Sequence, residues 1–273
     1  MPSTYAHYRF GREVLSKLPE EIRKIILNEQ ELFNMGLHGP DLLFYYKPLT
    51  VNEVNSQGYG IHSEAGIDFF LPASKEIMKM AFSPAYLAYI YGVICHFALD
   101  RECHGYIDEK IAESGVSHAE IEVEFDRRLM VYDGFDPITH ILTEHIRPSK
   151  RSARVISSFY SKASADDIYR AMQSYVFYNR LLIAPSVFKR EFVYGILKIS
   201  GHYDEMHGLM VNYRPNPKCS DSNRELAVRY GRAIKKAVML ISGFEGSAKG
   251  LKPWCELYNY TFGSEYRERS YEV

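Results

Sequence analysis

The chain of 273 residues is long enough for one sizeable hydrophobic core or for two small domains. Hydrophobic residues make up 46% of it and charged residues 25%, which excludes a disordered or collagen-like chain. The formal net charge of −1 provides no overall field for nucleic acid or for an anionic membrane. Residues 1–140 nevertheless hold 12 Lys and Arg against 21 Asp and Glu, whereas residues 141–273 hold 21 against 13. The first half therefore favours cations and the second half anions.

The four cysteines are too few for a disulfide-based scaffold at this length. The first twenty residues contain no apolar run of the kind found in a signal peptide. The most apolar stretch, residues 85–99, is interrupted by Gly92 and His96 and is too short to span a bilayer. We therefore expect a cytoplasmic protein with reduced thiols and no transmembrane segment.

Hydrophobic periodicity predicts helices along most of the chain. Apolar residues at a spacing of three to four predict a helix over residues 18–35, with a proline in its first turn and Gly36 at its end. The next predicted helix begins at Pro84 and runs to about Ser114.

Two serines begin further predicted helices. Ser117, with Glu120 three residues later, is typical of a capping box and begins a helix that runs through Met130. Ser164, followed by acidic residues, begins another that runs to about Asn179.

The last predicted helix covers residues 221–241 and ends at Gly243. Loops are expected at residues 36–40, 47–59, 132–137, 213–222 and 243–253. The sequence shows no alternating strand pattern, no internal repeat and no linker rich in Pro, Gly or Ser. It therefore predicts an all-α fold, a compact multi-helix bundle that forms a single domain over residues 1–273.

One predicted helix carries ionisable residues at regular spacing: His96, Asp100 and His104 recur at intervals of four. Because each residue turns an α-helix by about 100°, these three side chains drift by only about 40° per step and share one face. His118 and Glu122 repeat the same spacing on the next predicted helix. Neutral imidazoles and carboxylates are the ligands that zinc accepts. The two stripes together predict a site for two divalent metal ions.

The alternative interpretation of each pair is structural. A single His and carboxylate at this spacing is usually a surface pair or a helix cap, whereas two such pairs on successive helices favour a metal site. His7, Asp41 and His62 are further candidates upstream. Asp41 also fits a helix cap after Gly39-Pro40, since Asp accepts hydrogen bonds from free backbone amides.

The candidate ligands occur in a familiar order: His7, Asp41, His62, His96, Asp100, His104, His118 and Glu122. Together with the opening Thr4-Tyr5-Ala6-His7 and the run Gly39-Pro40-Asp41-Leu42-Leu43, this order resembles the zinc-dependent phospholipases C, the family that includes clostridial alpha-toxin and the bacillary enzyme. More distantly, it resembles the single-strand-specific zinc nucleases. The resemblance covers roughly residues 1–125 and implies an all-α fold.

The resemblance also implies a role for each residue. Asp41, His62, His96 and Asp100 would bind one zinc ion, His104, His118 and Glu122 a second, and His7 with Asp100 would help to bind a third. Asp41 would assist as general base. Zinc-bound hydroxide would attack a phosphodiester while the zinc ions neutralise its charge.

Three features differ from the family pattern. Characterised members begin at a Trp whose amino group binds a zinc ion, whereas this sequence begins Met1-Pro2, so Pro2 would have to take that place. Asp100 and His104 are four residues apart, closer than in the secreted enzymes. Neither a signal peptide nor a C-terminal β-sandwich for membrane docking is visible, so we do not expect lipid in a host membrane to be the substrate.

Three functional hypotheses follow. The first is a zinc-dependent phosphodiester hydrolase of the phospholipase C type, acting on a small phosphodiester or a phospholipid head group. The second keeps the metal site but makes the protein a nuclease or another phosphodiesterase, and only here is nucleic acid a partner. The third is a metal-stabilised helical protein that binds a partner without turnover. The oligomeric state is not predicted.

Other polar residues receive structural interpretations. The histidines outside the pattern that we assign to the surface or core are His140, His145, His202 and His207. Cys95 and Cys103 each precede a candidate ligand by one residue, so they point about 100° away and are interpreted as packing residues. The sequence contains no Walker loop, no GxSxG elbow and no dinucleotide-binding glycine pattern.

Overall fold

The computed structural model describes residues 4–267, without the side chains of residues 204 and 205. Its elements are α1 Thr4–Leu15, α2 Glu20–Asn28, α3 Gln30–Gly36, η1 Gly39–Tyr45, α4 Glu53–Ser63, α5 Gly66–Lys79, α6 Pro84–Ser114, α7 His118–Tyr132, α8 Lys150–Ser157, α9 Ala165–Leu182, α10 Val187–Ile199, α11 Tyr203–Met206, η2 His207–Leu209, η3 Pro217–Cys219, α12 Ser220–Ala248 and η4 Glu256–Asn259, where η marks a 3₁₀ helix. Within residues 4–267 the only β-structure is a pair of isolated bridges, which join Ala65 to Thr261 and Tyr260 to Tyr266. The all-α prediction is therefore confirmed.

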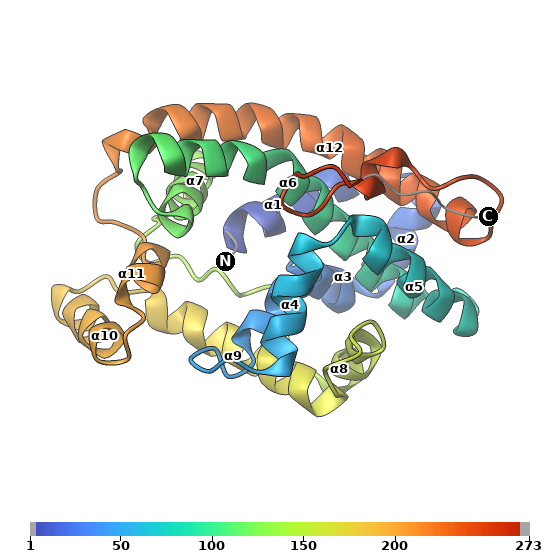
Figure 1. Cartoon of the computed structure of the whole chain (residues 1–273), viewed down its shortest axis with the longest axis horizontal. Coiled ribbons are helices and arrows are strands. Elements are labelled where there is room, and N and C mark those ends of the chain that lie inside the picture. The colour runs from blue at the N-terminus through green and yellow to red at the C-terminus, as the bar shows by residue number, and fades with distance from the viewer. Residues whose placement is uncertain (1–3, 268–273) are drawn as a thin grey trace.

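Helix α6 lies at the centre of the fold. From Ala85 to Asp100 nearly every side chain is buried, which explains why apolar residues cover all of its faces. Helices α3 and α12 pack along it, and α1 and α2 also contact it. Figure 1 shows α12 crossing the top of the view beside α7, with α9 on the opposite side of the molecule. For all its apolar character, α6 does not qualify as a membrane-spanning segment, and neither does any other helix in the described range.

The buried apolar residues form two clusters. The larger one extends from α1 to the segment after α12. The smaller one consists of Ala184, Val193, Leu197 and Met210, around α10. A single domain over residues 1–273 remains our prediction.

Three predicted helices are found close to their expected positions. α6 spans Pro84–Ser114 as predicted. α7 follows Ser117, whose side chain accepts a hydrogen bond from the backbone N–H of Glu120. α9 follows Ser164, which forms a capping box with Asp167.

Other helix boundaries were predicted wrongly. The expected helix over residues 18–35 is divided at Glu29, whose backbone angles (φ −127°, ψ 38°) end α2 before α3 begins. α12 continues through Gly243 to Ala248, because Phe244 and Ala248 extend its buried stripe past the glycine. Two expected loops contain short 3₁₀ helices: η1 begins within residues 36–40, and η3 lies within residues 213–222.

The segment 47–59 was predicted as a loop, but most of α4 lies there. Asn52 begins the helix: its side chain accepts hydrogen bonds from the backbone N–H groups of Val54 and Asn55, and the Asn55 side chain accepts one from the N–H of Asn52. The buried side of the helix then packs against η1. This packing compensates for a sequence rich in Gly, Asn and Ser, which are weak helix formers.

α3 crosses α6 at a pair of glycines. A Cβ atom on Gly36 would lie 2.2 Å from the carbonyl oxygen of Tyr89, and one on Gly92 would lie 2.3 Å from the carbonyl oxygen of Phe33. Only glycine at both positions allows the two backbones to approach this closely. Because η1 follows α3 almost directly, this contact determines how near η1 lies to the ligand-bearing part of α6.

Gly92→Ala should lower the free energy of unfolding by about 3 kcal/mol, because the added methyl group meets backbone atoms that cannot move independently. The matched control is Gly231→Ala in α12, where an added Cβ meets nothing within 4 Å. The control should raise stability by up to about 1 kcal/mol, because Ala is the better helix former. Urea unfolding followed by circular dichroism measures both, and equal stability of the two variants would contradict the close-contact interpretation.

Candidate metal centre

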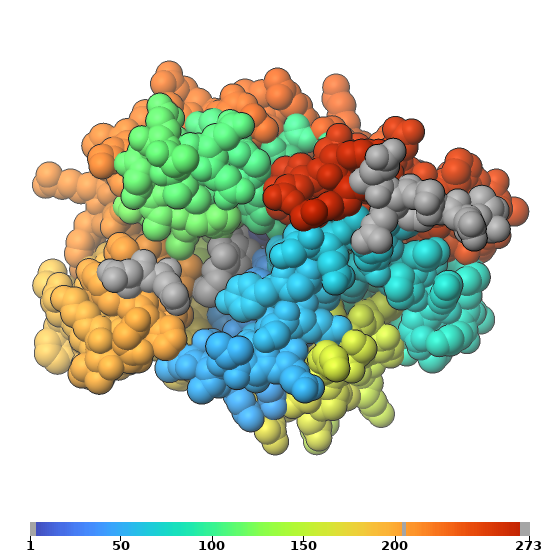
Figure 2. All heavy atoms as spheres, viewed as in Figure 1, coloured from blue at the N-terminus to red at the C-terminus, as the bar shows by residue number. Residues whose placement is uncertain are grey.

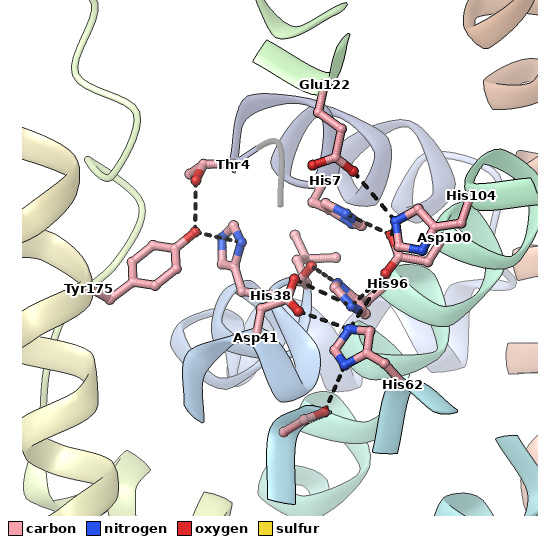
Figure 3. Close-up of polar contacts among 12 residues, drawn as sticks. Thr4, His7, His38, Asp41, His62, His96, Asp100, His104, Glu122 and Tyr175 are labelled. Carbon is pink, nitrogen blue, oxygen red and sulfur yellow. Dashed lines mark hydrogen bonds and ion pairs between the residues drawn. The ribbon is translucent and has the colours of Figure 1, made fainter. Parts of the chain in front are cut away.

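The structure brings the eight predicted ligands together from five elements: α1, η1, α4, α6 and α7. Figure 3 labels all of them except His118. Their ligand atoms form two groups, each within 4.8 Å: Asp41, His62, His96 and Asp100 in the first, and His104, His118 and Glu122 in the second. His7 lies outside both groups but contacts the first, with Nε2 at 3.1 Å from Oδ1 of Asp100.

In the first group, two imidazoles face two carboxylates. Nε2 of His62 lies 2.9 Å from Oδ1 of Asp41 and 3.9 Å from Oδ2 of Asp100. Nε2 of His96 lies 3.1 Å from Oδ2 of Asp100 and 3.6 Å from Oδ2 of Asp41. Both rings therefore direct the same nitrogen toward the same pair of carboxylates.

The other ring nitrogen of each imidazole is already bonded. Nδ1 of His62 donates a hydrogen bond to the carbonyl oxygen of Gly58 at 2.8 Å, and Nδ1 of His96 donates to that of Leu37 at 3.2 Å. Because a carbonyl can only accept, the neutral rings carry their proton on Nδ1 and present a lone pair on Nε2. This is the arrangement that orients histidine ligands in metal sites.

The second group centres on Glu122. Its Oε1 lies 3.2 Å from Nε2 of His118 and 3.4 Å from Nε2 of His104. Nε2 of His104 also lies 3.7 Å from Oδ1 of Asp100, so this ring faces both groups. A cavity of about 20 Å³ lies between His7, Asp100, His104 and Glu122. It has room for about one water molecule or ion.

A glycine allows η1 to reach the ring of His96. Gly39 has a φ of 44°, in the left-handed region, and a Cβ atom there would lie 2.8 Å from Cδ2 of His96. Asp41 follows in the first turn of η1. Its carboxylate faces the imidazoles of His62 and His96.

His38, which is completely buried, is a functional residue that was not predicted from the sequence. Its Nδ1 lies 2.9 Å from the hydroxyl of Tyr175, and its Nε2 lies 2.8 Å from Nε2 of His145. These contacts connect the turn before Asp41 to α9 and to the segment before α8. His38 therefore positions Asp41, and its place three residues before that aspartate was the available signal.

Asp126 was also missed. From α7 it accepts hydrogen bonds from the backbone N–H groups of Tyr5 and Ala6, at 2.9 and 2.7 Å. These groups belong to the first turn of α1, where backbone amides have no partner within the helix. Asp126 thereby positions the helix that carries His7, and its i,i+4 spacing from Glu122 was the available signal. Burial raises the pKa of Asp126 to about 7, although the two backbone hydrogen bonds oppose the shift.

The other histidines and the cysteines belong to neither group. His202 and His207 bond to carbonyl oxygens of their own segment. His140 stacks on Phe135, and burial lowers the pKa of His145 to about 3. All four cysteines lie in the described residues and are free thiols. Pro2, the expected substitute for an N-terminal ligand, lies outside the described residues.

The charges of the site compensate one another. Burial lowers the pKa of His104, but the carboxylates of Asp100 and Glu122 outweigh burial and raise it to about 9. The same balance raises the pKa of His7 and His62, and imidazoles outweigh burial to lower the pKa of Asp41, Asp100 and Glu122. Without metal, protonated His104 therefore faces ionised carboxylates at neutral pH.

The donor set fits zinc. Among the described residues, three buried ligand-type atoms have no hydrogen-bond partner: Nδ1 of His7, Nε2 of His96 and Oε2 of Glu122. Imidazole nitrogens and carboxylate oxygens at this density match zinc coordination. A divalent cation would also supply the positive charge that the metal-free site obtains from protons.

These features define a helical protein with two adjoining zinc-type ligand groups. The family comparison agrees: the family described as zinc dependent phospholipase C matches residues 6–179. This is more than half of the chain, so the chain belongs to that family of phospholipase-like hydrolases, as its sequence resemblance predicted. All eight predicted ligands lie within the matched residues. Neither the curated proteins nor the solved structures provide a match.

Removing one ligand from each group should remove zinc one ion at a time. We expect His96→Ala to lose the ion of the first group and His118→Ala that of the second, and both to melt at lower temperature, because a metal bound to the native state stabilises it. The matched control is His202→Ala, which should keep the full zinc content. Native mass spectrometry and calorimetry measure these outcomes. Unchanged zinc in both ligand variants would exclude the assignment.

Zinc binding and proton binding should compete. The raised pKa of His104 contributes stability below the unfolded value of 6.5, and this stability is lost as the pH rises through about 9. The metal-free protein should therefore melt at progressively lower temperature over that range. The stabilisation by zinc should grow over the same range, because zinc needs neutral imidazoles. Melting curves of zinc-loaded and chelator-treated protein test this, and a constant difference between them would contradict it.

Proposed function

We propose that this protein is a zinc-dependent phosphodiester hydrolase of the phospholipase C type. The observation that supports it most is the position of Asp100 between the two ligand groups. Its Oδ2 faces His96 at 3.1 Å, and its Oδ1 faces His7 at 3.1 Å and His104 at 3.7 Å. A carboxylate shared in this way allows two or three metal ions to act on one phosphodiester.

The proposal assigns the metal-binding roles as the family resemblance implies. One ion would be held by Asp41, His62, His96 and Asp100, a second by His104, His118 and Glu122, and a third by His7 with Asp100. Bound zinc supplies Lewis acidity, which neutralises the phosphodiester and makes water more acidic. The chain itself holds the imidazoles in their metal-binding tautomer through the carbonyl oxygens of Gly58 and Leu37.

Asp41 is the proposed general base. The imidazoles of His96 and His62 outweigh burial and lower its pKa, so the carboxylate is ionised at neutral pH. Its Oδ1 is held by His62 at 2.9 Å, whereas Oδ2 lies 3.6 Å from His96, beyond hydrogen-bonding distance. We assign Oδ2, the less tightly held oxygen, to accept the proton of an attacking water molecule.

The charge of the chain favours a phospholipid head group or a small phosphodiester over nucleic acid as the substrate. All eight proposed ligands belong to residues 1–140, which carry 21 acidic against 12 basic residues. This excess repels an extended polyanion more than it repels a single phosphodiester. The four free thiols suit a reducing compartment, and we extend the proposal to a cytoplasmic location.

Asp41→Asn should reduce kcat on a water-soluble phosphodiester such as p-nitrophenyl phosphorylcholine by at least ~100-fold, which is the size of a lost general base. Asp41→Asn should affect folding, measured by the melting temperature, less than it affects hydrolysis, because the amide keeps the shape of the side chain. The matched control is Asp108→Asn, an exposed position on α6. Zinc content is measured alongside activity, and full turnover of a zinc-loaded Asp41→Asn variant would remove Asp41 from the mechanism.

A substrate panel separates the proposal from its alternatives. Hydrolysis of phosphatidylcholine or of its soluble analogue supports the phospholipase C type. Hydrolysis of single-stranded DNA alone would support the nuclease hypothesis instead. Full zinc loading without turnover of any phosphodiester would support a binding protein.

A further inference from the structure

Helix α10 presents an apolar face to solvent. The side chains on this face and their exposed fractions are Phe188 85%, Phe192 59%, Ile196 43% and Ile199 90%. At about 100° per residue, these four positions lie within an arc of about 80°. The opposite side of the helix packs Val193 and Leu197 into the smaller apolar cluster, so the exposed face has a defined orientation. Figure 1 shows α10 at the edge of the molecule.

An apolar recess connects this face with the neighbourhood of the metal centre. It has a volume of about 70 Å³ and lies between η1, α9 and α10, with Tyr45, Leu49, Tyr178, Ile196 and Leu197 among its lining residues. Ile196 belongs both to the recess and to the exposed face. The recess is also lined by Phe44, whose ring centre lies 5.3 Å from that of His62. Apolar surface therefore extends from the outside of α10 toward the proposed zinc ligands.

The charge around α10 is basic. Residues 180–199 contain four basic side chains against the single acid Glu191. Arg190 is buried, and the half-buried Lys189 donates its ammonium hydrogen bonds to backbone carbonyl oxygens. Arg180 and Lys198 are the exposed basic side chains of this segment. An apolar stripe beside basic residues is typical of helices that lie in the interface of an anionic bilayer. Pairing of two copies through this face would instead bring two basic flanks into one interface.

We propose that α10 docks on the surface of an anionic phospholipid bilayer. In this arrangement Phe188, Phe192 and Ile199 enter the boundary between head groups and acyl chains, and the exposed basic side chains of Arg180 and Lys198 contact the lipid phosphates. The docking itself is independent of the proposed hydrolase activity. Its link to catalysis, which brings membrane phosphodiesters to the metal centre, rests on that proposed function.

Vesicle sedimentation tests the docking directly. We expect the full chain to bind vesicles of phosphatidylcholine with phosphatidylglycerol more tightly than vesicles of phosphatidylcholine alone. The double variant Phe188→Ser/Phe192→Ser should bind anionic vesicles about 100-fold more weakly, since each ring contributes roughly tenfold when it leaves water. The matched control is Leu251→Ser, at a position that is 79% exposed and outside α10; it should bind as the unsubstituted protein does.

Three results would overturn the docking proposal: no binding of the unsubstituted protein to anionic vesicles, equal binding by the double variant, or a dimer in solution that the double variant dissociates. Circular dichroism and melting temperature verify that the variant is folded, which the exposure of both rings favours.

Activity separates this inference from the proposed function. The double variant should hydrolyse the water-soluble phosphodiester at the normal rate and vesicle lipid more slowly. Binding through α10 without hydrolysis of any phosphodiester would leave the docking surface in place and exclude the hydrolase. Normal hydrolysis without vesicle binding would support the hydrolase and exclude the docking surface.

Discussion

The buried carboxylate of Asp100 is the feature on which the arrangement of the centre depends. It is 4% exposed, and a carboxylate removed from water in this way is stable only when positive charge surrounds it. Burial raises its pKa, yet the imidazoles of His96, His104 and His7 hold that pKa well below its usual range. His96 and His104 lie on α6 with Asp100, whereas His7 comes from α1, so displacing α1 would remove one of the three imidazoles that compensate the buried charge. The polar contacts of the site are therefore also contacts that hold the helices together.

Where the candidate ligands lie on one helix, the sequence alone was sufficient to predict that they share a face. The stripe of His96, Asp100 and His104 requires only the geometry of an α-helix, and the structure places all three on the side of α6 that faces the other predicted ligands. The approach of η1 could not be predicted in the same way. It depends on the glycine contact between α3 and α6 and on the left-handed backbone of Gly39, and neither has a periodic signal. The same holds for His38, whose partner Tyr175 lies 137 residues away in the chain.

The wrongly predicted helix ends have a common physical cause. Glycine has a low helix propensity, so the sequence predicts that the last long helix ends at Gly243. The propensity penalty of one glycine is about 1 kcal/mol, which is less than the burial of one large apolar side chain such as Phe244 provides. In α4, too, packing outweighs helix propensity: its weak helix formers become helical because one side of the helix packs on η1. Tertiary burial thus determined the length and position of these elements, and local propensity did not.

The metal-ligand residues and helix α10 lie in different parts of the chain and are subject to different structural requirements. All eight proposed ligands lie within the residues that match the family, 6–179, whereas α10 lies beyond them. A metal centre requires donor atoms within a few tenths of an ångström, so it depends on particular residues at particular positions. A docking face requires only apolar area beside basic charge, which many sequences provide. The family pattern therefore identifies the centre and carries no information about α10, where exposed side chains and charge are the only signals. The recess between η1 and α10 is the physical link between the two parts, since it contains residues from both.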